Sequence, residues 1–282
     1  MDVVRAKTAG FCMGVSLALK KLDTALRSQH YKRIYTLGPL IHNPQVLEFY
    51  ERKGVVLADT HTQFAQGDCV VIRAHGIPRQ NEEHLRQSGV HVIDATCPKV
   101  KKAQLAIAKA TAKGQTLLLF GEADHPEVRG LISYAVGASC VLGDPKALPD
   151  PTLVLSSGIV LASQTTQERA GFLALKTAMQ EHYPHLQVLE TICDATKERQ
   201  DEVRGIAKKV DIMVVVGGRS SGNTRRLADV SSSCGVPTLL VETADELKEE
   251  AFQGKHCVGL TAGASTPKRL IDEAENFLLA LT

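Results

Sequence analysis

The chain has 282 residues, of which 44% are hydrophobic and 23% are charged. This composition is typical of a globular protein and excludes a disordered or collagen-like chain, while the length allows one large domain or two to three modest ones. Lys and Arg total 33 against 31 Asp and Glu, only 4% of residues are aromatic, and there is no Trp. We therefore expect neither nucleic acid nor an anionic membrane as a partner, and an anionic ligand must be bound by local groups.

The apolar runs are too short for a transmembrane helix. The run 212–216 is far below the roughly 20 residues that span a bilayer. The run 11–19 follows Arg5 and Lys7 as in a signal peptide, but Lys20 stands where small cleavage-site residues should be. Seven Cys residues form an odd set without a C-x-x-C pair, so we expect a cytoplasmic protein with reduced thiols.

Short β-branched runs alternate with helical patterns, which predicts an α/β fold with mostly parallel sheets. In chain order, the expected strands are 33–37, 69–73, 90–94, 116–120, 152–155, 160–162, 187–191, 211–216, 238–241 and 257–261. The expected helices are 14–28, 98–113, 166–182, 197–210, 224–234 and 267–281. No Gly-rich or Ser-rich linker interrupts the pattern, so any domains should pack closely.

Three cysteines occur in the same local context at roughly equal intervals. At Cys12, Cys97 and Cys193 a strand pattern ends, one Cys stands at the turn, and a helical pattern begins. Such repetition predicts three pseudo-repeated α/β units, each contributing one Cys. The expected units are 14–97, 98–193 and 194–282 together with 1–13.

The other four cysteines lie in different surroundings. Cys69, Cys140 and Cys257 begin or interrupt apolar strand runs, and Cys234 ends a helical pattern. A free Cys in such a position usually packs as a small hydrophobic residue. We therefore expect these four thiols in the core.

A Cys at a helix N-terminus faces free backbone N–H groups, which favour the thiolate. Three converging thiolates would form a soft metal site with one coordination position open. Zinc with three Cys and a water fits this description, and so does a cubane iron-sulfur cluster whose fourth iron is open to substrate. The three cysteines alone are compatible with either metal site.

Further polar motifs follow other predicted strands. They are A-G-F-Cys12-x-Gly14-V, LGPLI-His42-Asn43-P, VIRA-His75-Gly76, DATC-Pro98-K-V, His125-Pro126-Glu127, Gln164-Thr165-Thr166, Ser221-x-Asn223 and Gly263-Ala264-Ser265-Thr266-Pro267. In this order and over residues 11–267, the chain resembles the 4-hydroxy-3-methylbut-2-enyl diphosphate reductases, which complete the non-mevalonate isoprenoid pathway. Each motif is weak alone, but the complete set is specific.

The resemblance implies a trefoil of three α/β units around a [4Fe-4S] cluster held by Cys12, Cys97 and Cys193. The fourth iron of such a cluster is open and binds the substrate hydroxyl. Electrons from a ferredoxin or flavodoxin then remove the hydroxyl and give isopentenyl and dimethylallyl diphosphate. The resemblance also implies that Glu127, ordered by Thr165 and His125, delivers the proton that lets oxygen leave as water.

The implied substrate-binding residues are neutral donors. They are His42, His75, His125, Thr165, Ser221, Asn223 and Ser265. Gly222 departs from the family pattern, which often has a second donor there, so Ser221 and Asn223 should carry this part of the site. Helix capping is the alternative role for Thr165, three residues before Glu168, and for Ser265 and Thr266.

Prolines mark several expected helix starts. Pro44, Pro98, Pro126 and Pro267 each follow a polar motif and should occupy the first helical position, where the missing N–H costs nothing. Helix N-termini should therefore gather at the carboxyl ends of the strands, where they can bind phosphate.

Two other functions remain open from the sequence. One is a dehydratase similar to quinolinate synthase, which also surrounds a three-Cys cluster with three units. The other is a zinc-binding or phosphate-binding protein without turnover.

Overall fold

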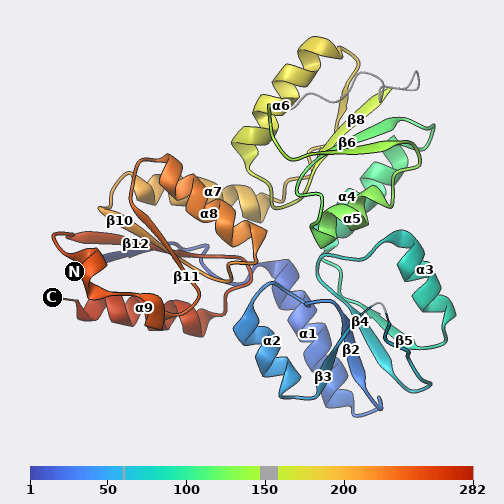
Figure 1. The fold of residues 1–282 in the computed structure, drawn as a ribbon, viewed down its shortest axis with the longest axis horizontal. Coiled ribbons are helices and arrows are strands. Elements are labelled where there is room, and N and C mark those ends of the chain that lie inside the picture. The colour runs from blue at the N-terminus through green and yellow to red at the C-terminus, as the bar shows by residue number, and fades with distance from the viewer. Residues whose placement is uncertain (60, 147–157, 282) are drawn as a thin grey trace. The chain divides into compact units, whose positions relative to one another are not determined.

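A computed structural model describes residues 1–59, 61–146 and 158–281, in two compact units (Figure 1). Unit 1 comprises Met1–Ser16, Ile41–Phe49 and Asp194–Thr282, and unit 2 comprises Leu17–Leu40 and Tyr50–Cys193. The strand expected at 152–155 lies outside the described residues.

Unit 1 contains one parallel sheet, sheet A, with the strand order β1-β12-β10-β11. Its strands are β1 (Asp2–Arg5), β10 (Ile212–Val216), β11 (Thr238–Val241) and β12 (Cys257–Ala262). Its helices are α7 (Asp194–Ala207), α8 (Gly222–Ser233) and α9 (Lys268–Ala280), with short 3-10 turns η2 (Ala244–Glu246) and η3 (Glu249–Phe252).

Unit 2 contains two parallel sheets, sheet B with the order β3-β2-β4-β5 and sheet C with the order β7-β6-β8-β9. The strands of sheet B are β2 (Ile34–Leu37), β3 (Val55–Ala58), β4 (Cys69–Ile72) and β5 (His91–Asp94). Those of sheet C are β6 (Thr116–Phe120), β7 (Ser139–Leu142), β8 (Ile159–Ser163) and β9 (Gln187–Val188). The helices wholly within unit 2 are α3 (Arg79–Gln87), α4 (Pro98–Ala110), α5 (Pro126–Ile132) and α6 (Arg169–His182).

Two helices have residues in both units. They are α1 (Met13–Ser28) and α2 (Pro44–Glu51).

All three sheets have the same topology. If the strands of each sheet are numbered along the chain, with β1 taken as the last strand of sheet A, each order is second, first, third, fourth. Every strand pair among the described residues is parallel, which confirms the predicted α/β class with three parallel sheets. The three expected units each contain one sheet, but their boundaries stay a prediction because sheets B and C share one compact unit.

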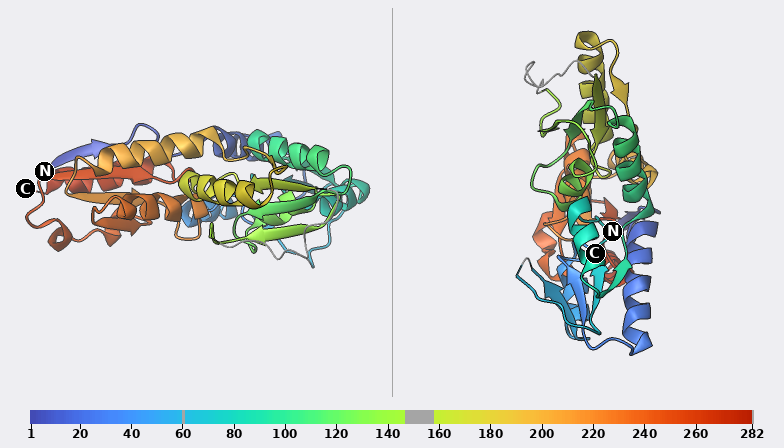
Figure 2. Two further views of the ribbon diagram at one scale, coloured as in Figure 1. Left: turned by 90° about the horizontal axis from the view of Figure 1, so that it is seen from above. Right: turned by 90° about the vertical axis from the view of Figure 1, so that its right-hand side faces the viewer.

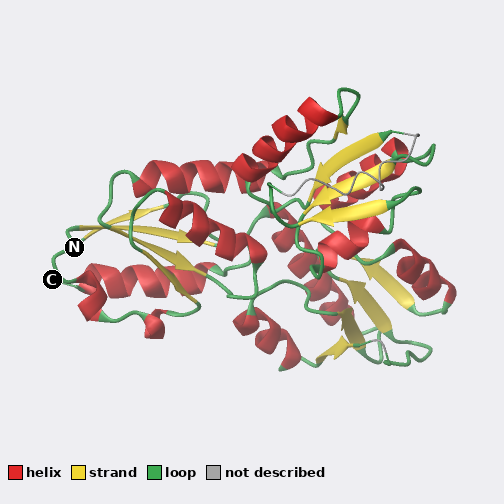
Figure 3. Ribbon diagram, turned by 45° about the horizontal axis from the view of Figure 1, so that its top comes forward, coloured by secondary structure: helices red, strands yellow, loops and turns green. Residues whose placement is uncertain are grey.

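Helices cover both faces of sheets A and C, as Figure 3 shows. In sheet C, Leu117 and Leu119 pack with α4 and α5, while Leu118 and Phe120 pack with α6. This alternation follows the pleat of a strand, and it explains why strands buried on both faces appear as continuous apolar runs. In sheet A, α9 covers one face and α7 with α8 the other.

The two chain ends meet in unit 1 (Figure 2). The Met1 amino group donates a hydrogen bond to the Leu281 carbonyl oxygen at 3.1 Å. This contact joins β1 to the end of α9, so the N-terminal strand completes a sheet whose other strands come from the C-terminal third of the chain.

The structure differs from the expected elements where side chains replace backbone pairing. β9 ends at Val188 rather than at residue 191, because the Thr191 hydroxyl bonds both the N–H and the carbonyl of Ser163, at 2.7 and 2.6 Å. Side-chain bonds of this kind compete with a regular ladder.

The expected strand and helix ranges omitted β1, β3, β7, α2, α3 and α5. Leu85 is the buried residue of α3, so this polar helix lacks the apolar period on which the prediction depends. Pro44, Pro98 and Pro126 begin their helices as predicted. Pro267 is the N-cap of α9, so this helix begins at Lys268, one residue later than expected.

Phe172 allows a test of the core of sheet C. Its side chain is 1% exposed and stacks with Phe120 at 6.5 Å between ring centroids. Phe172→Ala should reduce the free energy of unfolding by about 3–5 kcal/mol, because it removes apolar contacts and leaves a cavity. Urea unfolding followed by circular dichroism measures this change.

The matched control is Leu173→Ala on the same helix, since Leu173 is 41% exposed. We expect a change within about 0.5 kcal/mol for this surface substitution. Equal losses in the two variants would contradict the described packing of α6.

Candidate functional site

One backbone hydrogen bond is repeated in all three sheets. The N–H of a cysteine that follows the fourth strand donates to the carbonyl oxygen of the second residue after the third strand. These bonds join Cys12 to Ala264 at 3.1 Å, Cys97 to Ala74 at 2.9 Å, and Cys193 to Thr165 at 2.9 Å. Each cysteine is thereby held beside a loop that carries another predicted site residue.

The same three cysteines precede helices. Cys97 is the N-cap of α4, α1 begins directly after Cys12, and α7 begins directly after Cys193. The Val15 N–H points to the Cys12 sulfur, with 3.5 Å between N and Sγ. A sulfur at a helix start faces the positive end of the helix dipole, which suits a thiolate ligand.

The other cysteines have varied surroundings. Burial raises the pKa of Cys69 to about 11, and the thiol lies in the core as predicted. Burial also raises the pKa of Cys257, and nearby Asp2 and Asp211 add to the shift. The prediction of a core position is wrong for Cys234, which is exposed at the end of α8, where its sulfur donates to a helix carbonyl oxygen instead.

Glu127, in the first turn of α5, is a buried carboxylate of unit 2 with a side chain 1% exposed. Its Oε1 accepts a hydrogen bond from the Thr165 N–H at 2.6 Å, and its Oε2 accepts one from the Thr165 hydroxyl at 3.0 Å. The His125 side chain caps the same helix, because its Nδ1 accepts the Glu127 N–H at 3.1 Å. These contacts place a carboxylate, a hydroxyl and an imidazole together.

Thr165 is the centre of this group. Its carbonyl accepts the Cys193 N–H, while its own N–H and hydroxyl bond Glu127. Helix α6 begins at Arg169 with Glu168 as its N-cap, so the capping role considered for Thr165 is wrong. The threonine instead links a cysteine to a carboxylate through hydrogen bonds.

His75 and Arg73 follow β4 in the same unit. The His75 and His125 rings meet edge to face, with 5.4 Å between centroids. Arg73 donates from Nε to the Gly76 carbonyl at 3.3 Å, and burial with nearby Arg129 lowers its pKa to about 10. Arg73 therefore stays a cation at neutral pH beside the His75 turn.

The loop before Cys97 is fixed by Asp94. Its Oδ1 accepts the Thr96 N–H at 2.9 Å, and its carbonyl accepts the Lys21 ammonium at 2.5 Å. Burial alone would raise the pKa of Asp94, but the Thr96 hydrogen bonds and the charges of Lys101 and Lys21 lower it further than burial raises it. The carboxylate is thus charged at neutral pH and holds the turn that leads to Cys97.

His42 and Ser265 lie together in unit 1. The Ser265 hydroxyl donates to the His42 carbonyl oxygen at 2.9 Å. A Cβ added to Gly218 would come within 2.9 Å of the same oxygen, so the loop after β10 approaches this segment as closely as a glycine permits. The His42 segment is therefore held against the loops of sheet A.

Ser221 and Asn223 stand at the start of α8. Ser221 is the N-cap, and its Oγ accepts the Thr224 N–H at 3.4 Å. The Asn223 side chain is 7% exposed, and its buried Nδ2 has no hydrogen-bond partner among the described residues. A buried amide donor without a protein partner suits a bound anion.

The capping roles considered for Ser265 and Thr266 are also wrong. Pro267 is the N-cap of α9, the Ser265 hydroxyl bonds His42, and the Thr266 hydroxyl donates to the Val216 carbonyl at 3.0 Å. Both hydroxyls thus hold neighbouring loops in place.

The sequence patterns did not indicate Arg199 and Glu202, two residues of α7 that bind the loop before Cys12. Their spacing places them on one side of a helix, but the surrounding sequence KERQDEVR is that of a solvent-exposed helix. A local pattern could not have shown which loop they contact.

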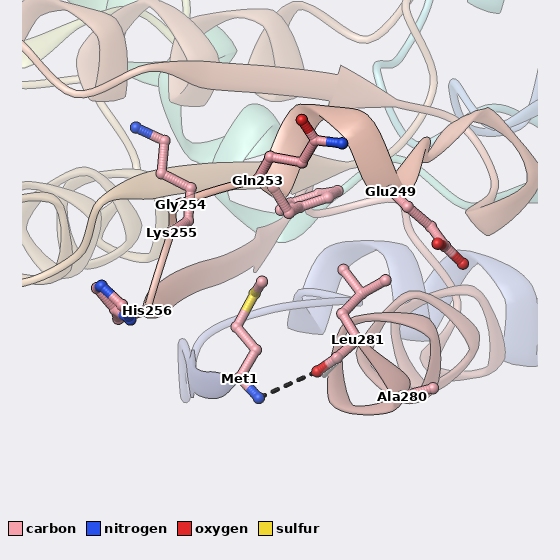
Figure 4. Close-up of a pocket in the computed structure, with 9 residues that line it drawn as sticks. Met1, Glu249, Gln253, Gly254, Lys255, His256, Ala280 and Leu281 are labelled. Atoms are coloured by element: carbon pink, nitrogen blue, oxygen red, sulfur yellow. Dashed lines mark hydrogen bonds between the residues drawn. The ribbon is translucent and has the colours of Figure 1, made fainter.

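A separate cavity of about 660 Å³ lies at the chain ends in unit 1 (Figure 4). Met1, Phe252, His256 and Leu281 are among its lining residues. It contains none of the predicted site residues, and we assign it no function.

None of the helices within the described ranges is both long and apolar enough to cross a membrane.

Comparison with known proteins identifies the family. The family model described as LytB protein matches residues 3–279, so the chain belongs to the LytB family. It is 59% identical to the 4-hydroxy-3-methylbut-2-enyl diphosphate reductase of Desulfovibrio desulfuricans, with 100% of both chains covered. The Aquifex aeolicus protein of the same name is 40% identical, with 98% of this chain and 95% of that protein covered.

Two solved structures share the fold. One, described as (E)-4-hydroxy-3-methyl-but-2-enyl diphosphate reductase, the terminal enzyme of the non-mevalonate pathway, has a TM-score of 0.73, 39% identity and 99% coverage of both chains. The corresponding reductase from Plasmodium falciparum has a TM-score of 0.91 and 27% identity, covering 98% of this chain and 87% of that one. The predicted family resemblance and fold class are confirmed.

Proposed function

We propose that the chain is a 4-hydroxy-3-methylbut-2-enyl diphosphate reductase, as its relatives are named. The reaction replaces an allylic C–O bond by C–H, consumes two electrons and two protons, and releases water. The observation that carries the proposal is the buried Glu127 carboxylate, held by Thr165 in hydrogen-bond connection with Cys193. This arrangement combines a carboxylate that could relay a proton through Thr165 with a predicted metal ligand.

Cys12, Cys97 and Cys193 would hold a [4Fe-4S] cluster with one iron free of cysteine. They fit this role because each of them precedes a helix and each makes the same kind of backbone hydrogen bond. Cys69, by contrast, is a buried thiol with a raised pKa. When bound, such a cluster supplies low-potential electrons and an open iron for the substrate oxygen. A ferredoxin or flavodoxin would be the electron donor.

Glu127 would deliver the proton that lets the substrate oxygen leave as water. Loss of oxygen from carbon in a dry site needs a proton, because hydroxide is a poor leaving group. The Thr165 hydroxyl lies 3.0 Å from Glu127 Oε2, so it can pass a proton between the carboxyl group and the substrate. His125 would orient Glu127 by accepting its backbone N–H.

Neutral donors would bind the diphosphate. The proposed donors are His42, His75, Ser221, Asn223 and Ser265, and the Arg73 cation lies at the His75 turn. Gly222 offers no side-chain donor, so Ser221 and the buried Asn223 amide supply this part of the site. Hydrogen bonds to an anion are stronger than those between neutral groups, which compensates for the small number of cations.

The set of metal ligands can be tested by replacement of single cysteines. Ser in place of Cys12, Cys97 or Cys193 should abolish the visible absorption of anaerobically purified protein, because each removes one of three ligands. Cys69→Ser and Cys234→Ser are controls that should keep it. Loss of absorption in a folded Cys69→Ser protein would contradict the assignment, and zinc in place of iron and sulfide would favour a non-catalytic metal site.

Asn223 tests the position of the diphosphate. Asn223→Ala should weaken substrate binding at least about tenfold, since a hydrogen bond to a charged group contributes roughly 1.5–3 kcal/mol. Isothermal titration calorimetry measures the affinity, and the cluster absorption should not change. Asn276→Ala, on the exposed side of α9, is the matched control. Wild-type affinity in Asn223→Ala would place the anion elsewhere.

Glu127 tests proton delivery. Glu127→Gln should lower kcat by about 10² to 10⁴, the usual contribution of general acid catalysis, while KM changes little. Anaerobic turnover with a chemical reductant measures both constants. Glu181→Gln, an exposed substitution on α6, should leave them unchanged. If Glu127→Gln turns over within a few-fold of wild type, the proton comes from another group.

A further inference from the structure

The loop before Cys12 is bound by a carboxylate from α7. Glu202 Oε1 accepts the Lys7 N–H at 2.7 Å, and its Oε2 accepts the N–H and the hydroxyl of Thr8 at 2.9 and 2.5 Å. All of these residues belong to unit 1. Three donors on one carboxylate fix both the position and the orientation of this part of the loop.

Arg199 binds the same loop one helical turn earlier on α7. Its side chain is 5% exposed, and its Nη2 donates to the Gly10 carbonyl oxygen. Gly10 has φ of +103°, in the region that favours glycine, and its position permits a close approach to Ile271. The loop is therefore held at two points, of which the second lies two residues before Cys12.

We propose that Arg199 and Glu202 are positioning residues that hold the Cys12 loop in the conformation needed for metal binding. The inference rests on the proposed function, because it takes Cys12 as a cluster ligand. The loop between β1 and α1 spans residues 6–12, and Cys12 itself is bound at its N–H by Ala264. Without the two α7 contacts, the preceding residues would lose the bonds that restrict them, and the thiol would be less often in place.

The first measurement reports on the loop itself. Hydrogen exchange by mass spectrometry on cluster-free protein should show faster exchange in the peptide that contains Lys7 and Thr8 when Glu202 is replaced by Gln. We expect about tenfold faster exchange, the effect of removing hydrogen bonds to a charged group. Asp201→Asn is the matched control, because Asp201 is the exposed neighbour of Glu202 on the same helix.

The second measurement reports on the metal ligand. Iron release to a chelator from anaerobically reconstituted protein should be several-fold faster in Glu202→Gln than in Asp201→Asn or wild type. Thr8→Val should act in the same direction, and the double variant Thr8→Val with Glu202→Gln should add little, because Thr8→Val removes one of the three bonds that already depend on the Glu202 carboxylate. Arg199→Lys keeps the charge but loses the planar guanidinium, and it should also speed iron release.

The outcomes separate this inference from the proposed function. Unchanged iron release in Glu202→Gln would overturn the positioning role, even if the loop exchanges faster. Additive effects in the double variant would overturn it as well, because Thr8 and Glu202 would then act independently. A wild-type protein that binds no iron under conditions that reconstitute clusters would overturn the proposed cluster and this role together. Thermal unfolding of each variant identifies a general loss of fold.

Discussion

The candidate site depends on the hydrogen bond from each of three cysteine N–H groups to the loop after the third strand of a sheet. This bond is a consequence of parallel topology, because the third and fourth strands are neighbours and their carboxyl ends lie at the same edge. The loops that follow these two strands can therefore meet, although Cys12, Cys97 and Cys193 lie seven, three and five residues beyond the end of the fourth strand. Directly after each cysteine the chain begins a helix, and the N-terminus of that helix faces the sulfur. The same sheet order thus repeats the same backbone surroundings of a cysteine three times.

Glu127 shows how this arrangement accommodates a buried carboxylate. Burial of a charge is costly unless hydrogen bonds replace those with water. Thr165 provides two of them from one residue, and it is held in turn because its carbonyl accepts the Cys193 N–H. A change at Thr165 would therefore disturb both the Glu127 carboxylate and the loop that carries Cys193.

The sequence predicted the parts of the structure that local patterns determine. The strands 116–120 and 238–241 match β6 and β11, because residues buried on both faces form apolar runs. The pattern failed for α3, where one Leu is buried, and for β9, where Thr191 replaces ladder bonds with its hydroxyl. It also left helix capping as an alternative role for Thr165 and Ser265, whose hydroxyls instead bond residues far away along the chain. Contacts between residues that are distant along the chain cannot be inferred from a local sequence pattern. The α7 contacts to the Cys12 loop were missed for the same reason.

The buried Asn223 amide destabilises the folded protein when no ligand accepts its hydrogen bond. A buried donor without a partner costs roughly 1–3 kcal/mol, and the folded chain keeps Asn223 Nδ2 unpaired among its described residues. Ser221 at the same helix start accepts the Thr224 N–H, so the local fold already uses the capping side chain. Asn223 is therefore not explained by the helix that carries it. An anion that accepts from this amide would remove the cost on binding, and the unpaired donor would then be a source of affinity for the proposed diphosphate substrate. Under this proposal, the unpaired Asn223 amide lowers the stability of the folded protein and raises its affinity for the anion.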